Sequence, residues 1–389
     1  MAVIKDKRYI NIIDTTLRNG EQTAGVVFSK HEKLRIVGLL DEIGIPEVEI
    51  GTPSLGLVER EIIKEIVQMK PKCKLFAYCE AKPENIEYVA ECGVKNVIIN
   101  ISTSDLHIDK KYNKNRTWVI NTLRATIRAA KSKNLNFIIS AEDATRTDLE
   151  FLLKILHIAK KKGALRFRIC DTVSKFDPFR TFLYINTISS ATNFPLEVYN
   201  HNDFGMATAN GMAAIRGGAS SLVVTINGLG EGTGNAALEE IVMALRYIEN
   251  LELGITTSKF REISEYVAKA SARAIPVWKA IVGTNVFAHE SGIHADGVLK
   301  NPKNYEVFRP GEVGLTRQLV VGKHSGSHTI LHKFKEFDIE LTDKESNEIL
   351  TLARAMAVDL KRSLFDKELM YVYKDYKSKK EKRSLEKGL

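Results

Sequence analysis

The sequence predicts an α/β protein, namely a (β/α)8 TIM barrel followed by a small helical domain. Two observations predict this fold. Between residues 9 and 228, eight short apolar runs rich in β-branched residues alternate with amphipathic stretches, and the remainder is longer than one closing helix needs. The chain has 389 residues, 44% of them hydrophobic and 27% charged, which excludes a fibre, a disulfide scaffold and a mostly disordered chain.

Each expected strand is a short apolar run that ends in polar residues. The eight runs are 9–17, 47–52, 73–79, 96–102, 136–143, 166–173, 196–203 and 221–228. Helix signals separate them, because capping boxes begin at Ser29 and Thr147, Pro83 suits a first helical position, and Gly44 suits a helix end. Eight alternating units predict a closed parallel barrel. An open doubly wound sheet is the alternative, although no GxGxxG follows the first run.

The expected domains follow from composition and periodicity. They are a barrel over 1–275, a linker or lid over 276–326, a small helical domain over 327–373 and a basic tail over 374–389. The tail holds seven basic and three acidic residues within a net charge of +9, so we expect it to be disordered. Its basic residues form no motif interleaved with stacking aromatics, so nucleic acid is not an expected partner.

The N-terminus and the cysteines indicate where the protein works. The segment MAVIKDKRYI lacks the apolar core of a signal peptide, and no stretch approaches the ~18 apolar residues of a membrane span. The four cysteines show no CxxC pairing, which indicates free thiols in a reducing compartment. We therefore expect a cytoplasmic protein with no membrane partner.

Polar side chains follow the expected strands, where barrel enzymes carry out their chemistry. Their mixture of carboxylates, one arginine and a histidine suits a divalent metal or an anionic substrate. Because side chains two apart on a strand point the same way, Tyr199 and His201 should both face the barrel axis. The strand-end residues include Asp14, Arg18, Asn19, Gln22, Glu49, Tyr78, His107, Glu142, Asp143, Asp171, Thr172, Tyr199, His201 and Asn227.

Two further segments suggest ligand binding. The glycine-rich run 227–235 precedes a helix and could bind phosphate, or it could be a tight turn that needs glycine. The linker contains HESGIHADG followed by GKHSG, and we expect these strings to fold together over a ligand. Five of the nine histidines lie there or just after, at His289, His294, His324, His328 and His332.

Six motifs in order resemble those of one enzyme family. DTTLRNGEQ, SAEDATRTD, HNDFGMATAN, NGLGEGTGNAALEE, HESGIHADG and GKHSG are similar to motifs of the acetyl-CoA-condensing barrel enzymes, which include isopropylmalate, citramalate and homocitrate synthases. EIGTPSLG and HNDFGMATAN most resemble the nitrogen-fixation type of homocitrate synthase. The resemblance implies condensation of acetyl-CoA with 2-oxoglutarate to give homocitrate and CoA, with a divalent metal polarising the ketone. It also implies a homodimer, or a hetero-oligomer with an active paralogue.

The resemblance assigns roles to individual residues. Arg18 would stabilise the oxyanion, Glu142 would orient substrate or metal-bound water, and Thr172 would hold the carboxylate of the 2-oxo acid. His294 and Tyr305 would form the acid–base pair that acts on the acetyl group. His107 would bind the distal carboxylate of the acceptor. Further substrate or CoA contacts would come from Gln22, Gly228, Gly230 and Gly232.

Two residues depart from the family pattern at the expected metal site. Asn19 stands where the family has Asp or Glu, and Tyr199 replaces the first histidine of an HxH motif. His201 and Asn227 remain as expected ligands. An amide brings no negative charge and a neutral phenol is a poor ligand, so Mg²⁺ or Mn²⁺ binding should be weakened. Two alternatives stay open: the same chemistry on pyruvate, oxaloacetate or 2-oxoisovalerate, or a metal-impaired, non-catalytic paralogue that serves as a partner subunit.

Overall fold

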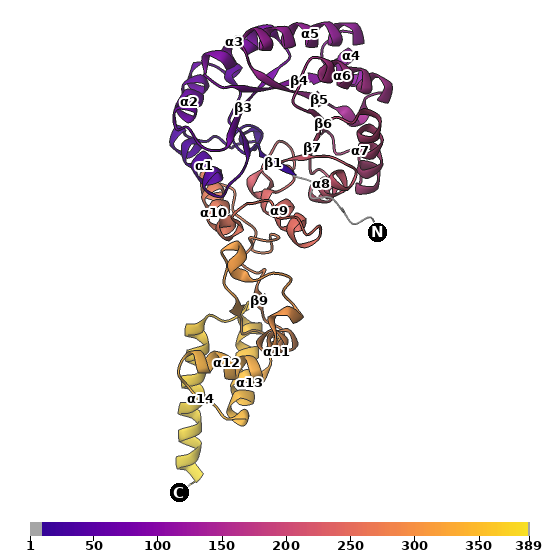
Figure 1. Ribbon diagram of the computed structural model, residues 1–389. Coiled ribbons are helices and arrows are strands. Elements are labelled where there is room, and N and C mark those ends of the chain that lie inside the picture. Colours follow the sequence, from indigo (N-terminus) through magenta and orange to yellow (C-terminus); the bar gives the residue numbers. More distant parts are fainter. Residues whose placement is uncertain (1–9, 388–389) are drawn as a thin grey trace. The chain divides into compact units, whose positions relative to one another are not determined.

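The computed structural model describes residues 10–387, and the chain divides between Ile275 and Pro276 into two compact units. We call them the barrel unit, residues 10–275, and the C-terminal unit, residues 276–387 (Figure 1). Among the described residues, no helix is both long and apolar enough to cross a membrane.

The barrel unit is a closed barrel of eight parallel strands in sequence order, which confirms the predicted fold class. The strands are β1 Asn11–Asp14, β2 Glu47–Glu49, β3 Lys74–Glu80, β4 Asn96–Ser102, β5 Asn136–Glu142, β6 Phe167–Asp171, β7 Leu196–Asn200 and β8 Ser221–Val224. β1 closes the barrel on β8, with Asp14 in register with Val224. Every residue of β1, β2, β6, β7 and β8 is buried, including the charged residues Glu47, Glu49, Arg168 and Glu197.

Helices surround the strands (Figure 1). They are α1 Lys30–Glu42, α2 Leu57–Gln68, α3 Pro83–Glu91, α4 Asp105–Lys110, α5 Arg116–Ser132, α6 Leu149–Lys161, α7 Pro178–Thr192, α8 Ala207–Arg216, α9 Leu238–Tyr247 and α10 Phe260–Ala270. The capping box of Ser29 with Glu32 is confirmed. The box predicted at Thr147 is wrong: α6 is capped by Asp148, which accepts from the Phe151 amide, while the Thr147 hydroxyl bonds to the Asp143 carbonyl.

The barrel interior carries an alternating chain of charges. Arg166 contacts Glu47 and Glu197, while Arg168 contacts Glu197 and Glu49. The Arg168 and Glu197 side chains are fully buried. Buried charges of this kind require paired partners, since each lone ion would lose several kcal/mol of hydration. This row of paired charges therefore links the amino-terminal end of the barrel to the carboxyl-terminal ends of its strands.

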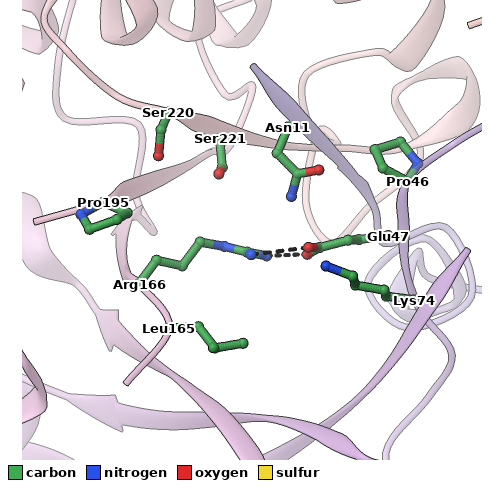
Figure 2. Close-up of a pocket in the computed structure, with 9 residues that line it drawn as sticks. All are labelled: Asn11, Pro46, Glu47, Lys74, Leu165, Arg166, Pro195, Ser220 and Ser221. Atoms are coloured by element: carbon green, nitrogen blue, oxygen red, sulfur yellow. Dashed lines mark hydrogen bonds and ion pairs between the residues drawn. The ribbon is translucent and has the colours of Figure 1, made fainter. Parts of the chain in front are cut away.

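A cavity of about 300 Å³ opens at the amino-terminal ends of the strands (Figure 2). Figure 2 shows the Arg166 guanidinium pointing to the Glu47 carboxylate across this cavity. Its lining consists of Asn11, Pro46, Glu47, Lys74, Leu165, Arg166, Pro195, Ser220 and Ser221. Barrel enzymes react at the other end of their strands, so we assign this cavity a structural role.

The C-terminal unit contains a two-stranded parallel sheet and four α-helices among its described residues. They are β9 Ala288–His289, β10 Gln318–Leu319, α11 Gly292–Lys300, α12 Ser327–Glu336, α13 Asp343–Leu360 and α14 Asp366–Lys387. Its core includes Val321, Phe334, Ile349, Ala353 and Leu369. Helix α13 begins with a capping box of Thr342 and Glu345.

The prediction of a disordered tail over 374–389 is wrong for residues 374–387, which continue helix α14. Glu345 of α13 accepts hydrogen bonds from Lys377 at 3.1 Å and from Lys380 at 3.0 Å. Tyr376 lies in the core of the unit, 7% exposed. Contacts with α13 therefore hold the helix, while residues 388 and 389 lie outside the described part.

Candidate active site

Arg18 lies just beyond β1 at the carboxyl-terminal end of the barrel. Its Nε donates to Glu49 Oε2 over 2.9 Å, and its guanidinium carbon lies 4.4 Å from the centre of the Tyr78 ring. The side chain is buried, and burial alone would lower its pKa, but the Glu49 charge outweighs this and raises the pKa. Arg18 is thus a permanent cation held in place from two sides.

Glu49 is the carboxylate that fixes Arg18. Burial would raise its pKa, but the charges of Arg168 and Arg18 outweigh burial and lower the pKa to about 2. The Thr15 hydroxyl adds a hydrogen bond of 2.8 Å to the same oxygen, Oε2. Glu49 is therefore ionised and fully engaged in holding cations.

Two asparagine amides bond to each other beside Arg18. Asn235 Nδ2 donates to Asn19 Oδ1 over 2.6 Å, and Asn19 Nδ2 donates to Gln22 Oε1 over 3.0 Å. A Cβ at position 230 would lie 2.6 Å from Asn19 Oδ1, so the loop needs glycine to pack on this pair. This supports the tight-turn interpretation of Gly230, and the role in CoA binding stays a prediction.

Tyr199 faces the barrel interior, as the strand periodicity predicts. It packs with Ile13, Cys170 and Val223, and its ring centre lies 5.0 Å from that of His201. Burial raises the pKa of the phenol, so it stays protonated. Among residues 10–387, the buried Tyr199 Oη has no hydrogen-bond partner. For His201, burial and the Arg18 charge lower the pKa, which favours the neutral imidazole.

A second polar cluster surrounds Glu142 at the end of β5. Glu142 accepts hydrogen bonds from Lys111 at 2.8 Å, from Ser102 at 2.9 Å and from Asn100 at 3.0 Å. Burial would raise its pKa, but Lys111 and the hydroxyl and amide donors outweigh burial and lower the pKa. Glu142 is therefore ionised and oriented by its neighbours.

His107 joins this cluster at the start of α4. Its Nδ1 lies 3.3 Å from Glu142 Oε1, and its Nε2 lies 3.3 Å from Arg146 Nη2. Arg146 is held by Asp143, whose backbone amide donates to the Thr172 hydroxyl over 2.9 Å. The structure thus brings three predicted residues together at the ends of β4, β5 and β6.

Asn227 does not lie with Asn19, Asn235 and Gln22, whose side-chain amides bond to one another. It lies in the short 3-10 segment Ile226–Gly228, and its Nδ2 donates over 2.9 Å to the Ser264 carbonyl on α10. Asn235 occupies the expected position instead, since it bonds to Asn19 and pairs in a bridge with His201. Sequence reasoning missed Asn235, although it ends the same glycine-rich string, because the way the loop folds back decides which asparagine arrives.

His294 and Tyr305 contact each other within the C-terminal unit. Their ring centres are 4.4 Å apart, and Gly297 leaves room for the tyrosine, because a Cβ there would overlap its ring. The linker motifs also pack together: the Gly292 amide donates to the His324 carbonyl over 3.1 Å, and the His324 amide donates to Glu290. His294 and Tyr305, the expected acid–base pair, thus lie in contact within the C-terminal unit.

Comparisons with known proteins decide the family. Residues 9–267 match the family described as HMGL-like, and residues 281–361 match the homocitrate synthase post-HMGL domain. The chain belongs to the acetyl-CoA-condensing enzymes of the HMGL-like family. It is 53% identical over 375 residues to 2-isopropylmalate synthase 2 of Caldanaerobacter subterraneus, covering 96% of this chain and 97% of the relative.

Other members of the acetyl-CoA-condensing family are also similar along nearly their whole length. Homocitrate synthase 1 of Nostoc sp. is 45% identical over 364 residues, covering 94% of this chain and 97% of the relative. The solved hydroxymethylglutaryl-CoA lyase of Pseudomonas aeruginosa shares the fold at a TM-score of 0.60 and 18% identity, covering 69% of this chain and 94% of that one. Membership in the family supports enzymatic condensation on a 2-oxo acid, while the names of the relatives give different products.

Proposed function

We propose that the protein is an acyltransferase that condenses acetyl-CoA with 2-oxoglutarate to give homocitrate and CoA. The observation that carries this choice of acceptor is a cluster of polar side chains at the ends of β4 and β5. We propose that it lines the acceptor site, and we call it the polar wall. Its side chains are Asn100, Ser102, Ser104, His107, Lys111, Glu142, Asp143 and Arg146.

This wall suits a dicarboxylic acceptor better than a branched aliphatic one. An isopropyl group would remove water from these polar groups without replacing their hydrogen bonds, which costs free energy. A second carboxylate on the acceptor would instead accept hydrogen bonds from His107, Lys111 and Arg146, which lie together in this wall. The wall therefore favours 2-oxoglutarate over 2-oxoisovalerate.

The reaction proceeds in three steps for which the chain supplies groups. A base in the pair His294 and Tyr305 removes a proton from the acetyl methyl group, and the resulting enolate attacks the acceptor ketone. Arg18 stabilises the alkoxide that forms, since it is a fixed cation with little hydration to lose. Water then cleaves the thioester and releases CoA, with Glu142 orienting reactant or water.

A second candidate is the same condensation on another 2-oxo acid. The relative that is 53% identical is named 2-isopropylmalate synthase 2, which favours 2-oxoisovalerate, and a 38% identical relative is named (R)-citramalate synthase, which favours pyruvate. Oxaloacetate, a shorter dicarboxylate, fits the same polar wall.

Release of free thiol from acetyl-CoA tests the proposal. The purified protein is assayed with each of the four 2-oxo acids, and we expect the highest kcat/KM with 2-oxoglutarate. Arg18→Gln should abolish release, whereas the matched control Arg60→Gln should retain it, since Arg60 stacks on Tyr88 of outer helix α3. Release with 2-oxoisovalerate alone would support the second candidate. No release with any acid would contradict both and favour a non-catalytic partner subunit.

We also propose that the protein forms a homodimer, or a hetero-oligomer with an active paralogue. Size-exclusion chromatography with light scattering on the full chain tests this, and a monomer at all concentrations would contradict it.

A further inference from the structure

In the acetyl-CoA-condensing chemistry a divalent cation polarises the acceptor ketone. A site for such a cation needs side-chain atoms that Mg²⁺ or Mn²⁺ accepts as ligands. The candidate ligands that the structure brings together are Asn19, Tyr199, His201 and Asn235. Among residues 10–387, no group of three or more His, Cys, Asp or Glu side chains could hold a metal. Mg²⁺ and Mn²⁺ prefer carboxylate oxygens, and this set contains none.

The amide oxygen of Asn19 is already engaged. It accepts from Asn235 Nδ2 over 2.6 Å, while Asn19 Nδ2 donates to Gln22. A cation at Asn19 Oδ1 would have to break this pair, which Gly230 packs against. The residue that replaces an acidic ligand therefore has a structural partner of its own.

Charge also opposes a dication at this position. Arg18 lies close by, with its guanidinium carbon 5.6 Å from the centre of the Tyr199 ring. The carboxylate beside it, Glu49, is shared between Arg18 and Arg168. A dication would add two positive charges next to a buried arginine with no uncommitted carboxylate in the donor set, so the residues present do not fit it.

In the described part of the chain, the Tyr199 hydroxyl is an open hydrogen-bonding group beside the Arg18 guanidinium. Tyr199 is 4% exposed and Arg18 is 7% exposed. Within the described residues, neither Tyr199 Oη nor Arg18 Nη2 has a partner in hydrogen-bonding geometry, although Nη2 lies 2.9 Å from Glu49 Oε2. A buried hydroxyl is normally hydrogen-bonded, so the unpaired Tyr199 Oη points to a ligand next to the Arg18 cation.

We propose that Arg18 and the Tyr199 hydroxyl bind the oxygens of a 2-oxo acid directly, in a site that holds no divalent cation. The proposal rests on the proposed function for the identity of the acid. It makes Tyr199 a substrate-binding residue instead of a defective metal ligand. The Asn19–Asn235 pair then shapes the loop over this site.

Binding of Mn²⁺, measured by electron paramagnetic resonance on the full chain, tests the first half. We expect no saturable binding by the native protein at millimolar Mn²⁺, and clear binding by the double variant Asn19→Asp, Tyr199→His. Saturable micromolar binding by the native protein would overturn the proposal. If the double variant does not fold, the native measurement still decides.

Calorimetric binding of 2-oxoglutarate in the presence of EDTA tests the second half. Tyr199→Phe should weaken binding about tenfold, because it removes one hydrogen bond to a charged ligand. Tyr88→Phe is the matched control, since that phenol also stacks on an arginine but lies on α3. Unchanged affinity in Tyr199→Phe, or binding that requires Mg²⁺, would overturn the proposal.

The thiol-release assay separates this inference from the proposed function. Release that persists in EDTA supports both, whereas release that EDTA abolishes and Mg²⁺ restores overturns only the inference. If no acid gives release, the proposed function fails, and the calorimetric measurement with the same four 2-oxo acids still decides whether Arg18 and Tyr199 bind one.

Discussion

Arg18 and Arg168 share one carboxylate, that of Glu49. Oε2 of Glu49 accepts from Arg18 Nε over 2.9 Å, and Oε1 contacts Arg168. Arg18 belongs to the end of the barrel where the chemistry is expected, whereas Arg168 belongs to the buried chain that continues to Glu197. The position of the candidate catalytic cation is thus set from within the barrel.

Replacing Glu49 should therefore damage both stability and activity. Glu49→Gln keeps the shape but leaves two buried arginines short of an anion, so we expect a loss of about 3–5 kcal/mol in the free energy of unfolding. Urea denaturation measures this loss. The control Glu61→Gln breaks an exposed pair with Lys64 and should cost under about 1 kcal/mol. Equal losses in the two variants would contradict the role of Glu49 as the shared partner of two buried arginines.

Asp14 should make stability fall as pH rises. Burial, together with the charges of Glu49 and Glu239, raises its pKa to about 7 against two hydrogen bonds from Thr16. The folded state therefore keeps a proton that the unfolded state loses above pH ~4, and stability declines from there to pH ~7. We expect Asp14→Asn to gain stability relative to the native protein between pH 5 and pH 8. A pH-independent difference in urea denaturation would refute this.

The barrel could be predicted from the sequence because each strand is a local pattern. The charged interior could not, because Arg168 pairs with Glu49, 119 residues away, and nothing local identifies that partner. Glu142 is the last residue of β5 and Arg18 lies in the turn after β1, which makes strand ends a good guide to this site.

Loops and long-range pairs explain the other differences between the sequence-based expectations and the structure. The choice between Asn227 and Asn235 depends on a loop that folds back with the Gly228 carbonyl against Gly234. The helix over residues 374–387 depends on Glu345, which precedes it by about thirty residues and supplies the counter-charge that composition alone does not reveal.

His107 should control the choice of acceptor. His107→Leu removes the imidazole that contacts Arg146 and Glu142 and adds apolar surface, so we expect kcat/KM for 2-oxoglutarate to fall about tenfold or more. The value for 2-oxoisovalerate should fall less or rise, because the wall becomes less polar. The exposed control His157→Leu should change neither value. A parallel fall for both acids would show that His107 acts on a step common to all acceptors.

Tyr376 should stabilise the C-terminal unit, which distinguishes a docked helix from a disordered tail. Its ring is 7% exposed in the core of that unit, so Tyr376→Ala should cost about 3 kcal/mol in free energy of unfolding. Tyr371→Ala, in the same helix but 64% exposed, is the matched control and should cost little. Thermal denaturation of the full chain compares the two variants. Equal, small effects would mean that α14 does not dock on α13 in solution, since a helix free of α13 would leave both tyrosines in water.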